Sequence, residues 1–413
     1  MISDKIILAP YYWALRLRHW MYDKGWKKVQ TSPVPTICVG NIAVGGTGKT
    51  PFTELLLRLL RRTSAAASAS GDALTASGRG AGVAGEGAGV TPGRIGGPLA
   101  VLSKGYGRKS KGFLYVETDG TPALYGDEPL QIKRKFPDVP VAVCSDRIEG
   151  CRKLAGDGIS RILLDDAFQF RALKADCNIV LVEYERPLGK DRLLPLGRLR
   201  DLPSRIAAAD IIIASKCPDD LTDEEREAWI KALGLKNAYD ASACEPASAC
   251  EVASACDATS QSGDRHSRSD RESPIPVFFT TLRYAAPEAV FPEGDRHYLY
   301  SGKMIVLTGI ANDRPMLAHL GEKYRLASHL RFPDHHDFTP ADLAKIETAA
   351  IQTPEAIVLT TEKDAQRLLP LREKLSDDLL RRLFYLPIET RFLNPDDEDA
   401  FLKAQNRVLL KSL

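Results

Sequence analysis

A glycine-rich stretch, "VGNIAVGGTGKTPF" at residues 39–52, constrains the fold of this chain more than any other feature. In the P-loop pattern, two glycines separated by four residues are followed by Lys and then by Ser or Thr. Gly48, Lys49 and Thr50 fit the end of that pattern, whereas Ala43 occupies the position of its first glycine. An apolar run precedes the stretch, and the amphipathic "TPFTELLLRLLRR" follows it. The stretch therefore predicts a strand, a phosphate-binding loop and a helix in succession.

The residues of this loop have distinct expected tasks. Lys49 would contact the outer phosphates of a nucleotide, and the hydroxyl of Thr50 would bind Mg²⁺. The glycines free the backbone to turn its N–H groups toward phosphate. The positions expected to bind the nucleotide are Gly45, Gly46, Thr47, Gly48, Lys49 and Thr50.

A P-loop also needs a carboxylate at the end of a neighbouring buried strand, where it helps to hold Mg²⁺. The run "RILLDD" supplies Asp165 and Asp166 directly after three apolar residues. Both are candidate metal ligands, and the sequence does not distinguish which of them binds through its own oxygen. The alternative is a turn at the end of a strand, without a metal.

Short apolar runs alternate with helical patterns, which predicts α/β architecture. The expected buried strands are "TICVGN", "LAVLSKGYG", "VPVAVCS", "RILLDDAF", "CNIVLVEYE" and "DIIIASK". We expect a P-loop NTPase-like parallel-sheet domain and a second, smaller α/β domain. The expected bounds are 1–274 for the P-loop domain, 275–300 for linker strands, 301–390 for the smaller domain, and 391–413 for a C-terminal helix that packs back on the first domain.

Two low-complexity segments interrupt this pattern, at residues 63–98 and at about 240–273. They hold too few large apolar side chains to offset the entropy lost on ordering. The second segment spaces Cys244, Cys250 and Cys256 evenly, but no histidine or fourth cysteine completes a zinc set. We interpret both segments as expanded surface loops rather than as metal sites.

The overall composition excludes several classes of function. The 413-residue chain has a net charge of +2, which gives no overall field that would attract nucleic acid. Its eight cysteines include no CxxC pair. No apolar run approaches the length of a membrane span, so we expect a cytoplasmic protein in a reducing compartment.

The N-terminal segment is both basic and aromatic. Trp13, Leu17 and Trp20 are spaced i, i+4, i+7, so they share one face of a helix. Aromatic side chains beside cations suit the headgroup region of an anionic membrane, which predicts an interfacial helix over residues 6–20. The equally weighted alternative is a helix packed on its own domain.

Several motifs, in this order, resemble those of the tetraacyldisaccharide 4′-kinases, the lipid A 4′-kinases of Gram-negative bacteria. The family's loop matches residues 40–51 and also lacks the first P-loop glycine. The resemblance covers nearly the whole chain apart from the two low-complexity segments. The other matching stretches are "SKGYG" at 103–107, "GDEP" at 126–129, "DDAFQ" at 165–169, "LPLGRLRD" at 194–201, "TGIANDRP" at 308–315, "FPDHHDF" at 332–338 and "TTEKDAQRL" at 360–368.

The resemblance implies a kinase that uses ATP and Mg²⁺. It would transfer the γ-phosphate to the 4′-hydroxyl of a tetraacylated glucosamine disaccharide 1-phosphate in lipid A biosynthesis. It also implies a catalytic base at Asp127, a partner of that base at His335, and a catalytic role for Lys49. We expect Asp127 and His335 to lie on different domains, so that domain closure joins them. Arg108 and Arg147 are candidate contacts to the substrate phosphate, with ordinary surface charge as the equal alternative.

Two residues depart from the family's motifs. Lys104 replaces an arginine, which keeps the charge but loses bidentate geometry toward phosphate. Ala167 replaces a glycine, so a left-handed backbone at that position would be strained.

A substrate with four acyl chains stays in the bilayer. We therefore expect a monomeric, peripheral enzyme on the cytoplasmic face of the inner membrane, held there by the N-terminal helix. Two alternatives remain open, namely a P-loop kinase for a soluble acceptor and a nucleotide-dependent switch or partition-type ATPase. Val44 stands where partition ATPases carry a signature lysine, which counts against the switch.

Overall fold

The computed structural model describes residues 2–69, 97–235, 237–241 and 274–412. Most of both low-complexity segments, including Cys244, Cys250 and Cys256, lies outside these described residues. The chain divides into two compact units. The first unit comprises Met1–Lys104, Cys144–Thr281 and Arg391–Leu413, and the second comprises Gly105–Val143 and Leu282–Thr390.

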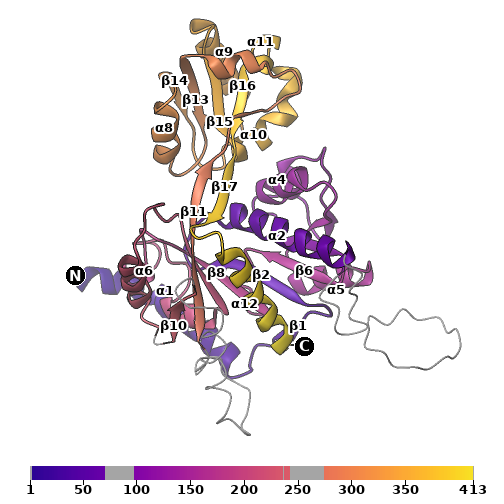
Figure 1. Ribbon diagram of the computed structural model, residues 1–413, viewed down its shortest axis with the longest axis vertical. Coiled ribbons are helices and arrows are strands. Elements are labelled where there is room, and N and C mark those ends of the chain that lie inside the picture. The colour runs from indigo at the N-terminus through magenta and orange to yellow at the C-terminus, as the bar shows by residue number, and fades with distance from the viewer. Residues whose placement is uncertain (1, 70–96, 236, 242–273, 413) are drawn as a thin grey trace, which may run out of the picture. The chain divides into compact units, whose positions relative to one another are not determined.

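The first unit is built on a parallel sheet (Figure 1). Because helices cover parallel sheets on both faces, the central strands carry continuous buried apolar runs. Neighbouring strands run parallel in the order β10 (Ala238–Asp240), β11 (Ile275–Tyr284), β9 (Ile211–Ser215), β8 (Cys177–Glu183), β2 (Thr36–Asn41), β6 (Arg161–Asp165) and β3 (Leu99–Ser103).

The C-terminal helix belongs to the first unit, although it follows the whole second unit in the sequence. The ring of Phe401 packs 5.8 Å from that of Phe52 and 5.6 Å from that of Phe278, measured between centroids. The other elements of this unit are α1 (Ile2–Asp23), β1 (Gln30–Thr31) paired with β7 (Leu173–Lys174), α2 (Lys49–Ala69), α5 (Arg147–Gly156), η1 (Leu188–Lys190), η2 (Pro203–Ala208), α6 (Asp223–Ala232) and the C-terminal α12 (Asp397–Ser412).

The second unit contains a five-stranded sheet. Its strands lie in the order β12 (Glu288–Ala289), β16 (Leu383–Leu386), β15 (Ile357–Thr361), β13 (Lys303–Thr308) and β14 (Arg325–Arg331), with β12 antiparallel to β16 and the other neighbours parallel. The other elements are β4 (Leu114–Tyr115) antiparallel to β5 (Val141–Val143), α3 (Pro122–Tyr125), α4 (Asp127–Lys135), η4 (Arg296–Tyr300), α8 (Arg314–Gly321), α9 (Pro340–Gln352), α10 (Glu362–Leu368), η5 (Leu369–Lys374), α11 (Asp377–Arg382) and β17 (Ile388–Phe392), which pairs with β11.

Successive residues of β13 face opposite sides of this sheet. Ile305 and Leu307 belong to one buried apolar cluster, whereas Met304 and Val306 belong to another. This alternation follows from the two-residue period of a strand. Residues of α9, α10 and α11 complete the first cluster and residues of α8 complete the second, so helices cover both faces.

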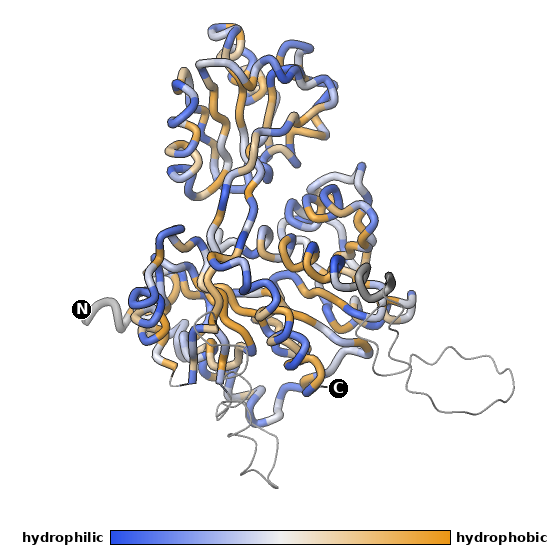
Figure 2. The backbone as a smooth tube through the Cα atoms, viewed as in Figure 1, coloured by the Kyte–Doolittle hydropathy of each residue, from blue (hydrophilic) through white to orange (hydrophobic). Residues whose placement is uncertain are grey.

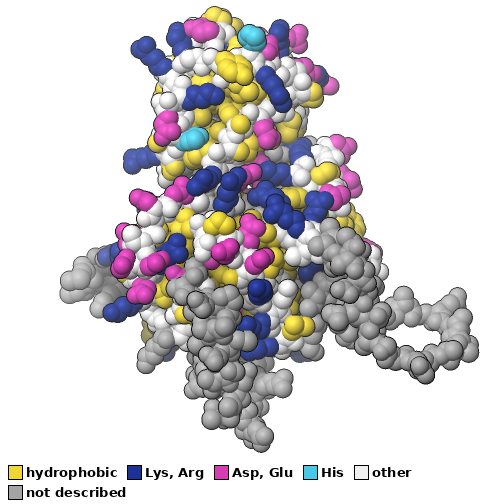
Figure 3. All heavy atoms as spheres, viewed as in Figure 1, with side chains coloured by type: hydrophobic (Ala, Val, Ile, Leu, Met, Phe, Trp, Pro, Cys, Tyr) yellow, Lys and Arg dark blue, Asp and Glu magenta, His cyan; other side chains and the backbone are white. Residues whose placement is uncertain are grey.

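The hydropathy of the chain follows this layering. Figure 2 shows hydrophobic strands inside each unit and helices with mixed faces. On the face of the second unit drawn in Figure 3, cationic and anionic side chains are interspersed. Among the described helices, none combines the length and the apolar character that a membrane span requires.

One boundary differs from the expected domain division. Residues 105–143 were expected in the first domain, but they cluster with the second unit. The reason is a set of polar pairs between α4 and α10, which join positions more than two hundred residues apart along the chain. These pairs are Lys135–Glu362 at 2.6 Å, Glu128–Lys363 at 3.1 Å and Arg134–Gln366 at 2.5 Å.

Substitution of Gly40 tests how closely β2 packs against the segment after β6. A Cβ at Gly40 would lie 2.5 Å from the Cβ of Phe168, closer than real carbon atoms approach. We expect Gly40→Ala to lower the free energy of unfolding by about 1–3 kcal/mol, because buried strands cannot shift freely. Thermal denaturation followed by circular dichroism measures this change.

Gly156→Ala at the end of α5 is the matched control, since nothing lies within 4 Å of the carbon that it adds. A wild-type Tm in Gly40→Ala would contradict the close approach of Phe168 to β2.

Candidate active site

The phosphate-binding loop joins the end of β2 to the start of α2. Gly45 and Gly48 adopt φ values of 99° and 82°, in the left-handed region that glycine enters without strain. The side chain of Asn41, the last residue of β2, donates a hydrogen bond to Oγ1 of Thr47 at 2.6 Å. The loop therefore has a fixed shape at the N-terminus of a helix, where backbone N–H groups attract anions.

A second segment runs beside this loop. The N–H of Val44 donates to the carbonyl of Arg198 at 2.7 Å, and the N–H of Arg200 donates to the carbonyl of Ile42 at 2.9 Å. The side chain of Arg198 pairs with Glu183 at 3.2 Å, and both line a pocket next to the loop. The motif "LPLGRLRD" therefore folds against the phosphate-binding loop.

Asp165 and Asp166 stand at the end of β6, which neighbours β2 in the sheet. Asp165 is buried, and its Oδ2 accepts a hydrogen bond from Oγ of Ser103 at 3.1 Å. Asp166 accepts hydrogen bonds from Arg200 on both carboxylate oxygens, one of them at 3.2 Å, and lies 3.9 Å from Nζ of Lys49. The structure thus brings Lys49 and Asp166 together.

The electrostatics of Asp166 favour its ionised form. Burial alone would raise the pKa of this carboxyl, but the nearby charges of Lys49 and Arg200 outweigh burial and lower it. Asp166 also has a φ of 48°, in the left-handed region. The strain anticipated at Ala167 therefore falls one residue earlier, because Ala167 is not among the described residues with positive φ.

The chemistry of these side chains fits a bound Mg²⁺. Mg²⁺ prefers oxygen ligands and usually keeps substrate phosphates and waters in its coordination shell. Among the described residues, no group of three or more His, Cys, Asp or Glu side chains could hold a metal alone. Two carboxylates after β6, with the hydroxyl of Thr50 at the start of α2, would instead hold the ion together with nucleotide oxygens.

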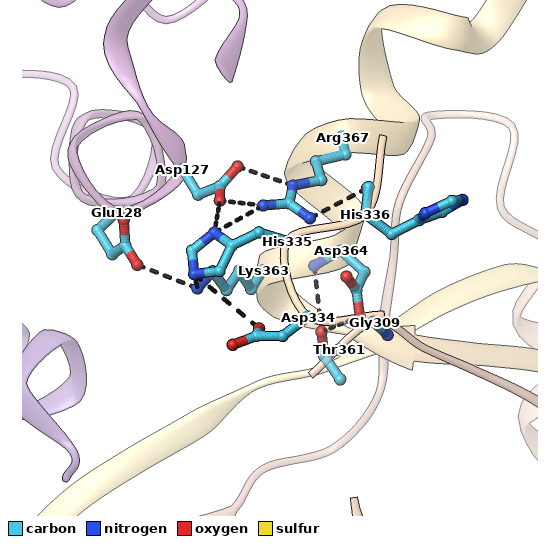
Figure 4. Close-up of polar contacts among 10 residues, drawn as sticks. All are labelled: Asp127, Glu128, Gly309, Asp334, His335, His336, Thr361, Lys363, Asp364 and Arg367. Atoms are coloured by element: carbon cyan, nitrogen blue, oxygen red, sulfur yellow. Dashed lines mark hydrogen bonds and ion pairs between the residues drawn. The ribbon is translucent and has the colours of Figure 1, made fainter. Parts of the chain in front are cut away.

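A second group of polar side chains lies within the second unit and centres on Asp127 (Figure 4). Asp127 begins α4 and is only 3% exposed. Nε of Arg367 donates to its Oδ1 at 2.9 Å, and Nη2 donates to its Oδ2. Nδ1 of His335 lies 3.0 Å from the same Oδ2. Asp127 and His335 were expected on different domains, yet they meet inside one unit, so no domain closure is needed to join them.

Charged side chains surround the imidazole of His335. Nζ of Lys363 lies 2.8 Å from Nε2 of the imidazole and 3.1 Å from the carboxylate of Glu128. Nδ1 lies 2.9 Å from Nη2 of Arg367 as well as 3.0 Å from Oδ2 of Asp127. The side chain of the neighbouring His336 points away from Asp127 (Figure 4). Its Nε2 lies 2.9 Å from Oδ2 of Asp342.

The ionised form of Asp127 is strongly favoured. Burial alone would raise the pKa of this carboxyl, but the hydrogen bonds from His335 and Arg367 and the charge of Arg367 lower it from 3.8 to about 2. The same contacts raise the pKa of Arg367 despite its burial. Asp127 is therefore a carboxylate at every physiological pH.

The two candidate phosphate contacts differ in environment. Arg108 lies in the second unit, where Nη2 donates to the carbonyl of Gly112 at 2.7 Å. Arg147 lies in the first unit, where it is 5% exposed and its guanidinium is 5.4 Å from the ring centroid of Phe170. Burial lowers the pKa of Arg147, while the nearby charges of Asp166 and Asp165 oppose that change.

Comparison with known proteins identifies the family. The sequence matches the family described as Tetraacyldisaccharide-1-P 4′-kinase over residues 5–68 and 94–407. Relatives named tetraacyldisaccharide 4′-kinase from Phocaeicola vulgatus and Cytophaga hutchinsonii are 33% and 32% identical to this chain. Those alignments cover 92% and 94% of this chain, and 88% and 92% of the relatives. The chain belongs to the tetraacyldisaccharide-1-P 4′-kinase family.

The fold class is confirmed by a solved structure. The crystal structure of LpxK from Aquifex aeolicus in complex with ATP has a TM-score of 0.60 to this chain at 24% sequence identity. The similarity covers 98% of this chain and all of that one. The internal stretch that the family match leaves out, residues 69–93, falls inside the first low-complexity segment.

The sequence analysis assigned no role to several charged residues that contact these candidate site residues. Arg200, Lys363 and Arg367 all lie inside motifs that carry the family resemblance. A positively charged residue inside a family motif indicates a possible role in the site. The sequence does not show which carboxylate or imidazole each of these three residues contacts. The structure supplies those partners.

The depressed pKa of Asp127 predicts a pH-dependent contribution to stability. A carboxyl whose pKa is lower in the folded chain stabilises it fully above the unfolded pKa of 3.8, and loses that contribution as pH falls toward about 2. We expect Asp127→Asn to have a lower free energy of unfolding than wild type near neutral pH. This difference, called the gap below, should narrow by about 2 kcal/mol between about pH 5 and pH 2. Urea denaturation followed by circular dichroism measures the gap.

The exposed Asp119 provides the control, because Asp119→Asn removes a solvent-exposed carboxylate and should change the free energy of unfolding at neutral pH by less than about 0.5 kcal/mol. A gap for Asp127→Asn that stays constant over this pH range would show that its ion pair with Arg367 is absent in solution.

Proposed function

We propose that this member of the 4′-kinase family transfers the γ-phosphate of ATP to the 4′-hydroxyl of a tetraacylated glucosamine disaccharide 1-phosphate, in lipid A biosynthesis. The observation that carries the proposal is the buried Asp127 carboxylate held by Arg367 and His335, in a chain that also has a phosphate-binding loop. A kinase needs both a place for the phosphates and an acceptor for the hydroxyl proton.

The first unit would bind the nucleotide. The N–H groups of Gly45, Gly46, Thr47 and Gly48 would face the phosphates, and Lys49 would neutralise charge on the β- and γ-phosphates. The Mg²⁺ held by Thr50, Asp165 and Asp166 would neutralise further charge on the same oxygens. Lys49 lies near Asp166, which supports a shared role at the outer phosphates.

The second unit would prepare the acceptor. Asp127 would accept a hydrogen bond from the 4′-hydroxyl and then its proton, as the base residue of kinases does. Arg367 holds the carboxylate in one plane, and His335 donates to Oδ2, so the remaining lone pairs have a fixed direction.

One face of α1 would bind the membrane surface. Trp13 and Leu17 are 62% and 57% exposed, whereas Leu15 and His19 on the other face are buried. Cations lie close to the exposed face, including Arg16, whose guanidinium is 5.8 Å from the ring centroid of Trp13. An apolar helical face beside cations suits an anionic lipid surface. Trp20 and Trp26 extend this face, with ring centroids 4.7 Å apart, and Lys24, Lys27 and Lys28 follow as exposed cations.

We further propose that the enzyme is a peripheral monomer on the cytoplasmic face of the inner membrane. ATP is available on that face, and the lipid acceptor remains in the bilayer. The single chain supplies the phosphate-binding loop, the carboxylates after β6 and the Asp127 group, so the proposed chemistry needs no second copy.

A radiolabel transfer assay tests the proposed reaction. The purified chain is mixed with γ-labelled ATP, Mg²⁺ and detergent-dispersed tetraacyl disaccharide 1-phosphate, and the lipids are separated by thin-layer chromatography. We expect a labelled lipid from wild type and none from Lys49→Ala. Asp127→Asn and His335→Ala should each lower kcat about 10²- to 10⁴-fold while ATP binding persists.

The adjacent His336 supplies the matched control, because it contacts Asp342 rather than Asp127. His336→Ala should keep turnover within about twofold of wild type. If wild type binds ATP but gives no labelled lipid, the proposal that the tetraacyl disaccharide 1-phosphate is the acceptor is rejected. Normal turnover in Asp127→Asn or His335→Ala would remove that residue from the mechanism.

Co-sedimentation with vesicles tests the membrane-facing role of α1. The double variant Trp13→Ser, Leu17→Ser should bind phosphatidylglycerol-containing vesicles at least about tenfold more weakly, because burying each side chain contributes about 1.5–3 kcal/mol. Ile351→Ser removes an apolar side chain of α9 that is 73% exposed, more than Trp13 or Leu17, and should leave vesicle binding unchanged. Equal sedimentation of the double variant and wild type would reject this docking face.

A further inference from the structure

The buried face of α1 contacts a segment that shapes the nucleotide site. Nε2 of His19 lies 2.5 Å from Oδ1 of Asp201, and the hydroxyl of Tyr11 donates to the backbone carbonyl of Arg200 at 2.9 Å. All of these residues belong to the first unit. The N-terminal helix is therefore tied, by a side chain and by a backbone group, to the residues that run beside the phosphate-binding loop.

His19 has a defined orientation and tautomer. Its side chain is buried, and Asp201 has no exposed surface. Nη1 of Arg171 lies 3.0 Å from Nδ1 of His19. Because a guanidinium only donates, Nδ1 accepts, and Nε2 carries the proton that it donates to Asp201. Loss of the imidazole would leave both an arginine and a buried carboxylate short of a partner.

The segment that His19 holds leads directly to a candidate metal ligand. Arg200, next to Asp201 in the chain, donates to Asp166 on both carboxylate oxygens. Its Nη2 also donates to Oδ1 of Asn41 at 2.5 Å, and Asn41 in turn holds Thr47 of the loop. A shift of this segment would therefore change the direction of the Asp166 carboxylate and the shape of the loop together.

A second connection runs from α1 to the same place. Nη2 of Arg18 donates to the carbonyl of Gln169 at 2.6 Å, and the side chain of Gln169 donates to the carbonyl of Asn41. Arg171, two residues further, contacts both His19 and Asp23. Gln169, in the segment after β6, and Arg200, in the segment after η1, therefore both donate hydrogen bonds to Asn41. Helix α1 contacts both segments.

We propose that His19 is a positioning residue for phosphoryl transfer. It holds Asp201 in place, and Arg200, the adjacent residue, then orients the Asp166 carboxylate toward the phosphates. The inference rests on the proposed kinase function and goes beyond it. It makes α1 a shared element, since Trp13 and Leu17 face the lipid surface while His19 sets the geometry of the nucleotide site.

Two substitutions of His19 separate alignment from bulk stability. His19→Ala removes both hydrogen bonds, whereas a Gln side chain can donate to Asp201 and accept from Arg171. In the transfer assay, His19→Ala should lower kcat between about tenfold and a hundredfold, because small misplacements of catalytic groups have effects of this size. The KM for the lipid should change less than about twofold. His19→Gln should recover most of kcat.

Hydrogen exchange gives a readout that needs neither Mg²⁺ nor turnover. In His19→Ala, amides at residues 166–171 and 199–202 should exchange faster, while those of β13 in the second unit should match wild type. The exposed His297 supplies the matched control, and His297→Ala should leave kcat and exchange unchanged.

The outcomes are distinguishable. A wild-type chain that labels no lipid rejects the kinase proposal itself. A wild-type chain that is active, with His19→Ala equal to it in kcat and in exchange at 199–202, rejects only the positioning role. Equal loss of kcat in His19→Ala and His19→Gln also rejects it. If His19→Ala does not fold, Tyr11→Phe removes only the hydroxyl bound to Arg200, and an unchanged kcat and unchanged exchange at 199–202 in that variant reject the proposal.

Discussion

The guanidinium of Arg200 is the contact on which the geometry of the nucleotide site depends. It joins Asn41, at the end of β2, to Asp166, just after the end of the neighbouring β6. Parallel strands bring their carboxyl ends to one edge of a sheet, but the side chains there still need orientation. A planar guanidinium with fixed donors orients two oxygen groups at once, which a flexible ammonium cannot do. Asp166, which accepts these hydrogen bonds, has a left-handed backbone with a φ of 48°.

The low pKa of Asp127 bears on how a kinase of this kind would work. A carboxylate with a pKa of about 2 is a weak base, so most of its contribution would be to orient the hydroxyl and to accept the proton late. The transition state of phosphoryl transfer is loose and asks little of the base. Any phosphate group that came close to Asp127 would bring negative charge and raise the pKa of this carboxyl. Arg367 and His335 offset that effect in advance, so the carboxylate would stay ionised when the nucleotide arrives.

Much of the fold could be predicted from local pattern. Apolar runs of about five residues predicted the strands, and the glycines with Lys49 and Thr50 predicted the loop, because strand burial and phosphate binding each leave a local signature. The grouping of residues 105–143 with the second unit could not be predicted, since it depends on contacts between α4 and α10. Polar pairs between two charged helices leave no periodic trace in either sequence.

The sequence indicated which residue types belong to the candidate site, but not which side chains contact one another. The two carboxylates after β6 follow a buried run, and that position is readable from sequence. The sequence does not show that Asp166 rather than Ala167 takes the left-handed conformation, nor that its carboxylate contacts Arg200, which lies 34 residues further along the chain. In the same way, nothing in "DHHD" shows that His335 contacts Asp127 while His336 turns to Asp342. A left-handed backbone at His335, with a φ of 59°, makes two adjacent histidines point apart.

The N-terminal helix shows why two interpretations of its sequence, an interfacial helix and a helix packed on its own domain, do not exclude each other. Its sequence allowed either an interfacial helix or a helix packed on its own domain. A helix has more than one face, and here Leu15 and His19 are buried while Trp13 and Leu17 are exposed. Residues four apart on each face are neighbours, so one helix can carry a packing stripe and an exposed apolar stripe at once. Because the packed stripe contacts Asp201, beside Arg200, a short series of hydrogen bonds links α1 to the carboxylate of Asp166.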